Sequence, residues 1–104
     1  MIITKHKKID AAGTVAITSK SFTLRQLVIV VSDDGSTWKI RVEDNDTPPS
    51  IVVAPVDVAA PSTVSWINEK FEHPLPIVDG LDFVTVSGTH GTLDLWYSYD
   101  QPSN

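Results

Sequence analysis

Hydrophobic and polar side chains alternate most clearly in residues 38–44. One side of this segment carries Trp38, Ile40 and Val42, and the other side carries Lys39, Arg41 and Glu43. A period of two is typical of a β-strand that buries one face. The preceding residues 22–31 form a strongly apolar run, which predicts a second strand.

The Asp34-Gly35 dipeptide lies between these two predicted strands and suits a two-residue type I′ turn, because both central residues of that turn need positive φ. With this turn, three apolar pairs fall on one face. The pairs are Val31 with Trp38, Ile29 with Ile40, and Leu27 with Val42. The agreement between turn chemistry and hydrophobic pattern predicts a hairpin over residues 22–44.

A second hairpin is predicted around Gly88-Thr89-His90-Gly91, with residues 81–87 and 92–100 as its two strands. Two registers stay open: one pairs Val86 with Leu93, and the other pairs Phe83 with Leu95 or Tyr97. In either register the hairpin has large apolar side chains on both faces. The last strand carries Leu93, Leu95, Tyr97 and Tyr99 on one side and Trp96 on the other.

Shorter segments complete the predicted set of strands, and they are residues 2–9, 14–18, 50–54, 63–67 and 71–78. Residues 2–9 predict an edge strand, because its three lysines discourage pairing with the edge of another chain. Residues 63–67 fit either a strand or a single turn. Pro74 and Pro76 restrict residues 71–78 to an extended loop or an edge strand.

The composition agrees with this pattern, since 13 Val, 9 Ile and 10 Thr make 32 of the 104 residues β-branched. Such side chains lose rotamer freedom in helices and pack well on a pleated surface. Seven prolines and five glycines keep the elements short. We predict an all-β fold: one domain, residues 1–104, built as a small antiparallel β-sandwich of six to eight short strands.

Several classes of protein are excluded by the same composition. The chain has no cysteine for a disulfide scaffold or a zinc–thiolate site, and no apolar run near the ~18 residues that span a bilayer. Its first eight residues carry charges where a signal peptide needs an apolar stretch. The net charge of −5 and a pI near 4.9 argue against nucleic-acid binding. We therefore expect neither a nucleic acid nor a membrane as partner.

Candidate chemistry is sparse. His6, His73 and His90 lie in three separate segments without the spacing of metal ligands, which favours exposed histidines. Residues 43–46 gather oxygen ligands of the kind that calcium prefers, but they lack the glycine of the calcium-loop pattern. Bonds from these side chains to their own loop backbone are the favoured interpretation. We expect no catalytic, metal or cofactor-binding residue and no enzyme activity; a small hydrolase that uses Asp33, Asp34 and His90 is a minor alternative.

The segment Ser32-Asp33-Asp34-Gly35-Ser36-Thr37-Trp38 resembles the S-x-D-G-x-x-W hairpin of discoidin-type carbohydrate- or lipid-binding sandwiches, and in part the Asp-box of sialidase propellers. The chain also has more large aromatic residues than a two-sheet core of this size would readily enclose. They are Trp66, Phe71, Phe83, Trp96, Tyr97 and Tyr99. A carbohydrate-binding or receptor-binding module is therefore the alternative function.

The layout of the whole chain resembles the small decoration (cement) and head-associated proteins of tailed bacteriophages. The resemblance is carried by the lysine-rich start Ile2-Ile3-Thr4-Lys5-His6-Lys7-Lys8, by Pro74-Leu75-Pro76-Ile77-Val78-Asp79-Gly80-Leu81, and by the closing Gly91-Thr92-Leu93-Asp94-Leu95-Trp96-Tyr97. It implies a jelly-roll-like sandwich without a cofactor that binds the major capsid protein on the outer head surface. It also implies a homo-oligomer, with a trimer favoured, and a virion protein made in the host cytoplasm.

An apolar hairpin with two bulky faces predicts a surface that another chain covers. The candidate interface residues are Phe83, Trp96, Tyr97, Tyr99, Lys5, Lys7 and Lys8.

Overall fold

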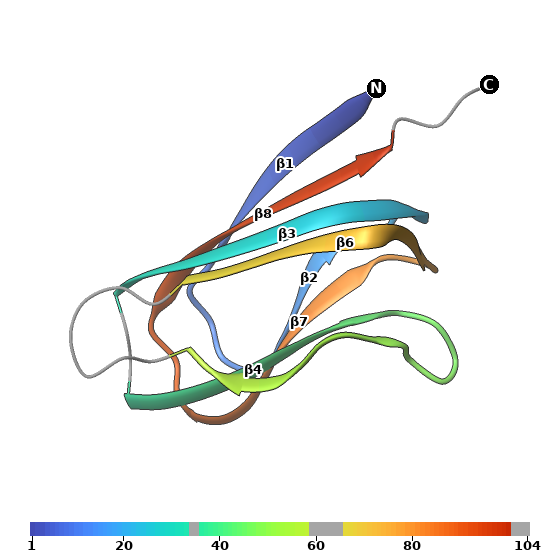
Figure 1. The fold of residues 1–104 in the computed structure, drawn as a ribbon. Helices are drawn as coiled ribbons and strands as arrows, with labels where there is room; N and C mark the ends of the chain where they lie inside the picture. Colours follow the sequence, from blue (N-terminus) through green and yellow to red (C-terminus); the bar gives the residue numbers. More distant parts are fainter. Residues whose placement is uncertain (34–35, 59–65, 101–104) are drawn as a thin grey trace.

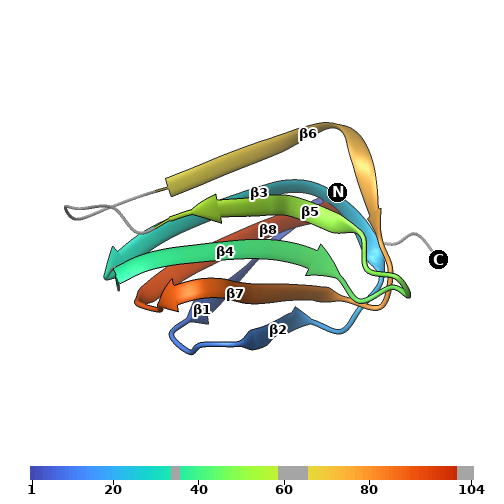
Figure 2. The same cartoon turned by 90° about the horizontal axis from the view of Figure 1, so that it is seen from below.

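Two four-stranded antiparallel sheets pack face to face in the computed structural model, which describes residues 1–33, 36–58 and 66–100 (Figures 1 and 2). The eight strands are β1 (Ile2–Ile9), β2 (Thr14–Thr18), β3 (Phe22–Asp33), β4 (Ser36–Asp44), β5 (Ile51–Asp57), β6 (Trp66–Ile77), β7 (Leu81–Thr89) and β8 (Thr92–Asp100). The first sheet has the order β1-β8-β3-β6, and the second has the order β2-β7-β4-β5. The predicted antiparallel β-sandwich is confirmed. These ranges hold no helix long and apolar enough to cross a membrane.

Most predicted strand boundaries are confirmed. Residues 2–9, 14–18 and 92–100 are β1, β2 and β8, and β1 is an edge strand as predicted. β6 is the opposite edge of the same sheet, which agrees with the edge alternative for residues 71–78. An edge tolerates proline, because the missing N–H removes no ladder bond to a further strand. The predicted strand or turn at 63–67 lies mostly outside the described residues, which resume at Trp66.

The predicted hairpin over residues 22–44 is wrong. β3 pairs with β6 and β8 in the first sheet, whereas β4 pairs with β5 and β7 in the second. The Asp34-Gly35 turn itself lies outside the described residues. The side chains of the three predicted pairs are nevertheless all fully buried, and they are Leu27, Ile29, Val31, Trp38, Ile40 and Val42. Alternation identifies the inner face of each strand, but it does not distinguish a neighbour in the sheet from a partner across the core.

The predicted hairpin over residues 81–100 is wrong for the same reason. β7 lies between β2 and β4 in the second sheet, and β8 lies between β1 and β3 in the first. Neither proposed register occurs, because Leu95 pairs with Lys7 on one side and with Ile29 on the other. Phe83 and Leu95 thus contribute to the core from opposite sheets, each fully buried.

The connections between strands cross from sheet to sheet almost throughout the described chain. Only β4 and β5 follow one another within one sheet. The inner strands β3, β4, β7 and β8 each have one apolar face, and because they are divided between the two sheets, both sheets bury an apolar face against the other.

Trp38 lies on the inner face of the second sheet, near the start of β4, and is fully buried. Its Nε1 donates a hydrogen bond to Thr85 Oγ1 on β7 at 3.2 Å. Its ring meets Phe83 edge-on at 5.9 Å between centroids. Its carbonyl oxygen accepts a bond from the Val58 amide at 2.9 Å, where the chain leaves β5. One residue therefore joins β4 to β7 and to the end of β5.

Asp44, at the end of β4, is the one charged residue among the buried side chains described, with 1% of its surface exposed. Its Oδ1 accepts bonds from the amides of Ser50 at 2.7 Å and Asp46 at 3.3 Å. Its Oδ2 accepts a bond from the amide of Val78 at 3.3 Å. The favoured interpretation of residues 43–46, that their side chains bond loop backbone, is confirmed at Asp44. In the described residues, no group of three or more His, Asp or Glu is placed to hold a metal ion.

Gly80 has a φ of +113°, and a Cβ added at this position would collide with the Thr18 backbone carbonyl oxygen. We expect Gly80→Ala to lower the free energy of unfolding by about 3 kcal/mol or more, since strain and a backbone clash add. Gly13→Ala is the control: its φ is +82°, but nothing lies within 4 Å of the added Cβ. It should cost only about 1–2 kcal/mol. Urea denaturation measures both, and equal losses would contradict the clash.

Candidate functional site

The seven candidate interface residues do not form one surface. Phe83 is fully buried against Trp38, so its assignment to an interface is wrong. The reason is that β7 presents Phe83 to the core of the sandwich and not to the face of a hairpin. The other six residues divide between the outer face of the first sheet and its inner face.

Trp96 lies on the outer face of the first sheet, because its neighbours Leu95 and Tyr97 point into the core. Its register partners are His6 on β1 and Val28 on β3. The His6 and Trp96 rings lie 4.9 Å apart between centroids, and His6 Nε2 lies 2.8 Å from Asp94 Oδ1. Trp96 and Val28 are half-buried. We call Trp96, His6, Val28 and Asp94 the Trp96 face.

The three lysines of β1 separate between the two sides of this sheet. Lys8 pairs with Asp94 and so borders the Trp96 face. Lys5 pairs with Tyr97 and Lys7 pairs with Leu95, so both lysines lie on the inner side of the sheet. All three side chains are exposed.

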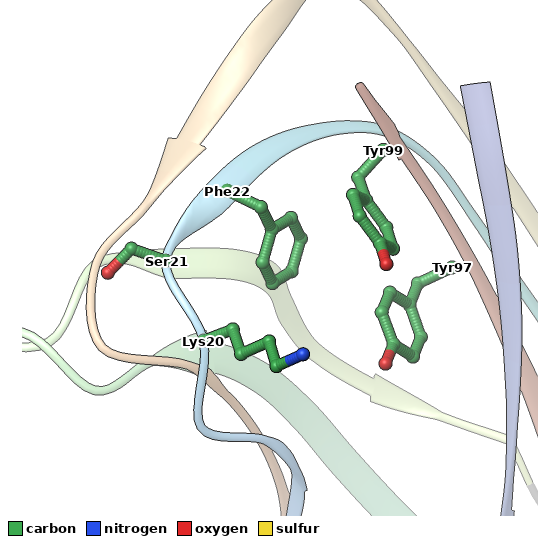
Figure 3. Close-up of a pocket in the computed structure, with 5 residues that line it drawn as sticks. All are labelled: Lys20, Ser21, Phe22, Tyr97 and Tyr99. Carbon is green, nitrogen blue, oxygen red and sulfur yellow. The ribbon is translucent and has the colours of Figure 1, made fainter. Parts of the chain in front are cut away.

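Tyr97 and Tyr99 line a pocket on the inner side of the first sheet, together with Lys20, Ser21 and Phe22 (Figure 3). We call it the aromatic pocket, and its volume is about 110 Å³. Lys20 and Ser21 belong to the connection that carries the chain from β2 to β3, and Phe22 is the first residue of β3. The two tyrosines come from the second half of β8, so the pocket joins segments that are about 75 residues apart.

Three aromatic rings in the pocket contact one another. The Phe22 ring lies 5.1 Å from Tyr99 and 5.8 Å from Tyr97, and the two tyrosine rings are stacked at 5.8 Å. Both tyrosine hydroxyls point to the same side, and Lys20 extends toward the rings (Figure 3). Burial raises the pKa of Tyr97, although a hydrogen bond with Thr18 opposes the shift. Tyr97 therefore stays a neutral phenol at neutral pH, with a hydroxyl that both donates and accepts.

An ion pair holds the end of β8 beside this pocket. The register of β3 shifts between Leu24 and Gln26, and Arg25 lies at this irregularity. Arg25 Nε lies 2.9 and 3.0 Å from the two carboxylate oxygens of Asp100, and its Nη2 lies 2.8 Å from Oδ2. This bidentate contact lowers the pKa of Asp100, because the hydrogen bonds from Arg25 favour the carboxylate.

Sequence reasoning included Tyr97 and Tyr99 but missed Lys20, Ser21 and Phe22. No local motif marks these three residues, since a Lys-Ser pair between two strands is an ordinary connection. Their role depends on the crossing from one sheet to the other, which brings the start of β3 beside the end of β8.

Of the residues of the alternative hydrolase, only His90 has a side chain that the structure describes. His90 lies in the connection from β7 to β8, with Nδ1 3.1 Å from the Gly91 carbonyl oxygen and its ring 6.3 Å from that of Trp38. His6 lies on the Trp96 face. The side chains of Asp33, Asp34 and His73 lie outside the described set.

Two carboxylates are neighbours on the outer face of the second sheet, where Glu43 of β4 pairs with Asp82 of β7. Arg41 Nε lies 3.1 Å from Glu43 Oε2, so Glu43 has an ion-pair partner. Partial burial, together with the charge of Glu43, raises the pKa of Asp82. Like charges opposite one another weaken a strand pair, so this pair costs stability at neutral pH.

Comparisons with known proteins show the fold alone. No protein-family model and no curated protein matches the chain. Among solved structures, it is similar to a Bacillus endospore appendage protein of a family of disulfide-linked pili, with TM-score 0.51, 13% identity, and coverage of 97% of this chain and 89% of the other. It is also similar to a family 32 carbohydrate-binding module of a family 31 glycoside hydrolase from Clostridium perfringens, with TM-score 0.52, 13% identity, and coverage of 93% and 76%. A family 29 carbohydrate-binding module matches with TM-score 0.50, 14% identity, and coverage of 89% and 69%.

The raised pKa of Asp82 predicts a stability gain for Asp82→Asn. A carboxyl whose pKa is raised on folding costs stability once it is ionised, and it costs nothing when it is protonated in both states. At pH 7 we expect Asp82→Asn to raise the free energy of unfolding by up to about 1 kcal/mol, a shift of several degrees in Tm. The gain should shrink as the pH falls and vanish near pH 3, below the ordinary value of 3.8.

Thermal unfolding at several pH values tests this expectation. Asp10→Asn is the control, because Asp10 is exposed beyond the end of β1. A gain at pH 7 equal to that of the control would contradict the role of the Asp82–Glu43 pair, and so would a gain that persists at pH 3.

Proposed function

We propose that this chain is a non-catalytic structural module that works in several copies, as a decoration protein on the outer head surface of a tailed phage. In this proposal it forms a homo-oligomer, with a trimer favoured, and contacts the major capsid protein. The Trp96 face is the observation that carries the proposal. The whole-chain resemblance to decoration proteins supports it as well.

The Trp96 face has the composition of a protein contact. A half-buried tryptophan lies on β8, one of the two inner strands of its sheet, with Val28 beside it and the polar side chains of His6 and Asp94 at its margins. Interfaces place aromatic anchors in an apolar centre and polar groups at the rim. No element among the described residues covers this outer face, because the second sheet packs on the opposite side.

Small size suits a role in many copies. A domain of 104 residues has one small core, and any single contact surface on it is modest. Repetition on a symmetric particle converts modest contacts into high avidity. The net charge of −5 favours solubility before assembly.

Trp96→Ala tests this proposal directly. Light scattering of the unchanged chain should give about three times the 11.4 kDa mass of one chain, and cosedimentation should show binding to phage heads. We expect Trp96→Ala to weaken assembly or head binding at least tenfold, the effect of losing about 1.4 kcal/mol or more at an aromatic anchor.

Val86→Ala is the control, because Val86 is 40% exposed and belongs to the other sheet. It should assemble as the unchanged chain does. A folded chain that stays monomeric at every concentration and ignores phage heads would overturn the proposal. A Trp96→Ala protein that assembles normally would show that the Trp96 face is not the contact surface of the proposed assembly.

A second candidate function is carbohydrate binding, and the aromatic pocket is the observation that favours it. Three rings and several hydroxyls in one small pocket suit a ligand with apolar faces and polar edges. Two of the similar structures are carbohydrate-binding modules, which is compatible with this use of the fold. The Ser32–Trp38 segment gives no such support, because Trp38 is fully buried and offers no face to a sugar.

A glycan array with a Tyr99→Ala variant tests the second candidate. We expect the unchanged chain to bind at least one class of glycan and Tyr99→Ala to bind it several-fold more weakly, because one wall of the pocket is lost. Trp96→Ala is the control and should bind as the unchanged chain does, since Trp96 points to the opposite side of the sheet. An array without binding would reject this candidate.

A further inference from the structure

The aromatic pocket has one cationic side chain at its margin, in a protein that is acidic as a whole. The chain has 13 Asp and Glu against 8 Lys and Arg, yet none of the five lining residues is acidic and one is Lys20. Lys5 lies on the same side of the sheet as the pocket, because it is the register partner of Tyr97. The local charge therefore favours an anionic ligand, against the overall balance.

The polar atoms of the pocket are donors suited to an oxygen-rich ligand. Lys20 carries an ammonium group, and the hydroxyls of Tyr97 and Tyr99 point to one side of the rings (Figure 3). Ser21 Oγ accepts a bond from the Asp79 amide at 2.9 Å, which leaves its own hydroxyl proton to donate. A ligand here meets aromatic surface on one part and hydrogen-bond donors on another.

The size of the pocket limits the ligand to a single ring. An apolar cavity of about 150 Å³ holds one benzene molecule. The aromatic pocket has about 110 Å³, and its mouth is open because Lys20 and Ser21 are exposed. One six-membered ring fits with part of it in solvent, whereas a long chain would have to lie outside.

We propose that the aromatic pocket binds one acidic sugar unit, a pyranose ring that bears a carboxylate. The carboxylate lies toward the Lys20 ammonium, and the C–H face of the ring packs against Phe22, Tyr97 and Tyr99. Sugar hydroxyls meet the tyrosine and Ser21 hydroxyls. This inference rests on the second candidate function, carbohydrate binding, and names its ligand class.

Two monosaccharides that differ at one position test the proposal by NMR titration of the full chain. Methyl glucuronide has a carboxylate where methyl glucoside has a hydroxymethyl group. We expect both to shift amide signals of residues 20–22 and 97–99, with the glucuronide binding about fivefold more tightly. Fivefold is the ratio that about 1 kcal/mol gives for an exposed charge pair. The difference should narrow in 0.5 M salt, because salt screens exposed charges.

The Lys20→Met variant tests whether Lys20 causes the preference for the glucuronide over the glucoside. The variant should bind the glucuronide about fivefold more weakly and the glucoside as before. Lys8→Met is the matched control, since Lys8 is an exposed lysine whose register partner, Asp94, lies on the outer side of the sheet. It should leave both affinities unchanged.

The possible results separate the two levels of the proposal. If both sugars bind equally and Lys20→Met changes neither, the acidic ligand class is overturned while carbohydrate binding stands. If neither sugar shifts the pocket signals, carbohydrate binding at this pocket fails as well. If acetate at the same concentration reproduces the shifts of the glucuronide, the pocket binds a bare carboxylate and the sugar assignment is overturned.

Discussion

Burial of one apolar face of each sheet against the other is the interaction on which the rest of this structure depends. Strands reach the two sheets in alternation, so neither sheet forms from one continuous part of the chain. Trp38 lies in the resulting core, with its indole N–H satisfied by Thr85 and its ring against Phe83. Because 104 residues supply only one core, the polar and aromatic groups left over at its margins are what remain for function.

β8 serves three surfaces at once because its side chains alternate and because it extends beyond the best-covered part of the core. Leu93 and Leu95 point inward and are fully buried. Tyr97 and Tyr99 point the same way but lie at the end of the strand, where they meet the start of β3 and form the aromatic pocket. Trp96 points outward. The proposed protein contact and the proposed ligand pocket therefore lie back to back on one strand.

The sequence around Asp44 has the oxygen ligands of a calcium site, but the buried Asp44 carboxylate has a structural role. Its two oxygens accept bonds from three backbone amides, which ties the connection from β4 to β5 to the connection from β6 to β7. Gly80 lies at the same junction, where the Thr18 carbonyl oxygen leaves no room for a side chain. In the described residues, every buried side-chain nitrogen or oxygen has a hydrogen-bond partner. At this end of the sandwich β2, the strand that precedes Phe22, pairs with the start of β7.

The sequence by itself determined the fold class, most strand boundaries and the inner faces of β3 and β4, because alternation and turn residues are local properties. It placed Leu27, Ile29, Trp38 and Ile40 inside correctly. Only the tertiary structure decided which strands are neighbours, because an apolar face packs equally well beside another strand or across from it. That decision turned two predicted hairpins into connections between sheets, buried Phe83, and brought Lys20 and Phe22 to Tyr97 and Tyr99. The pocket depends on this long-range crossing of the chain, which no local pattern records.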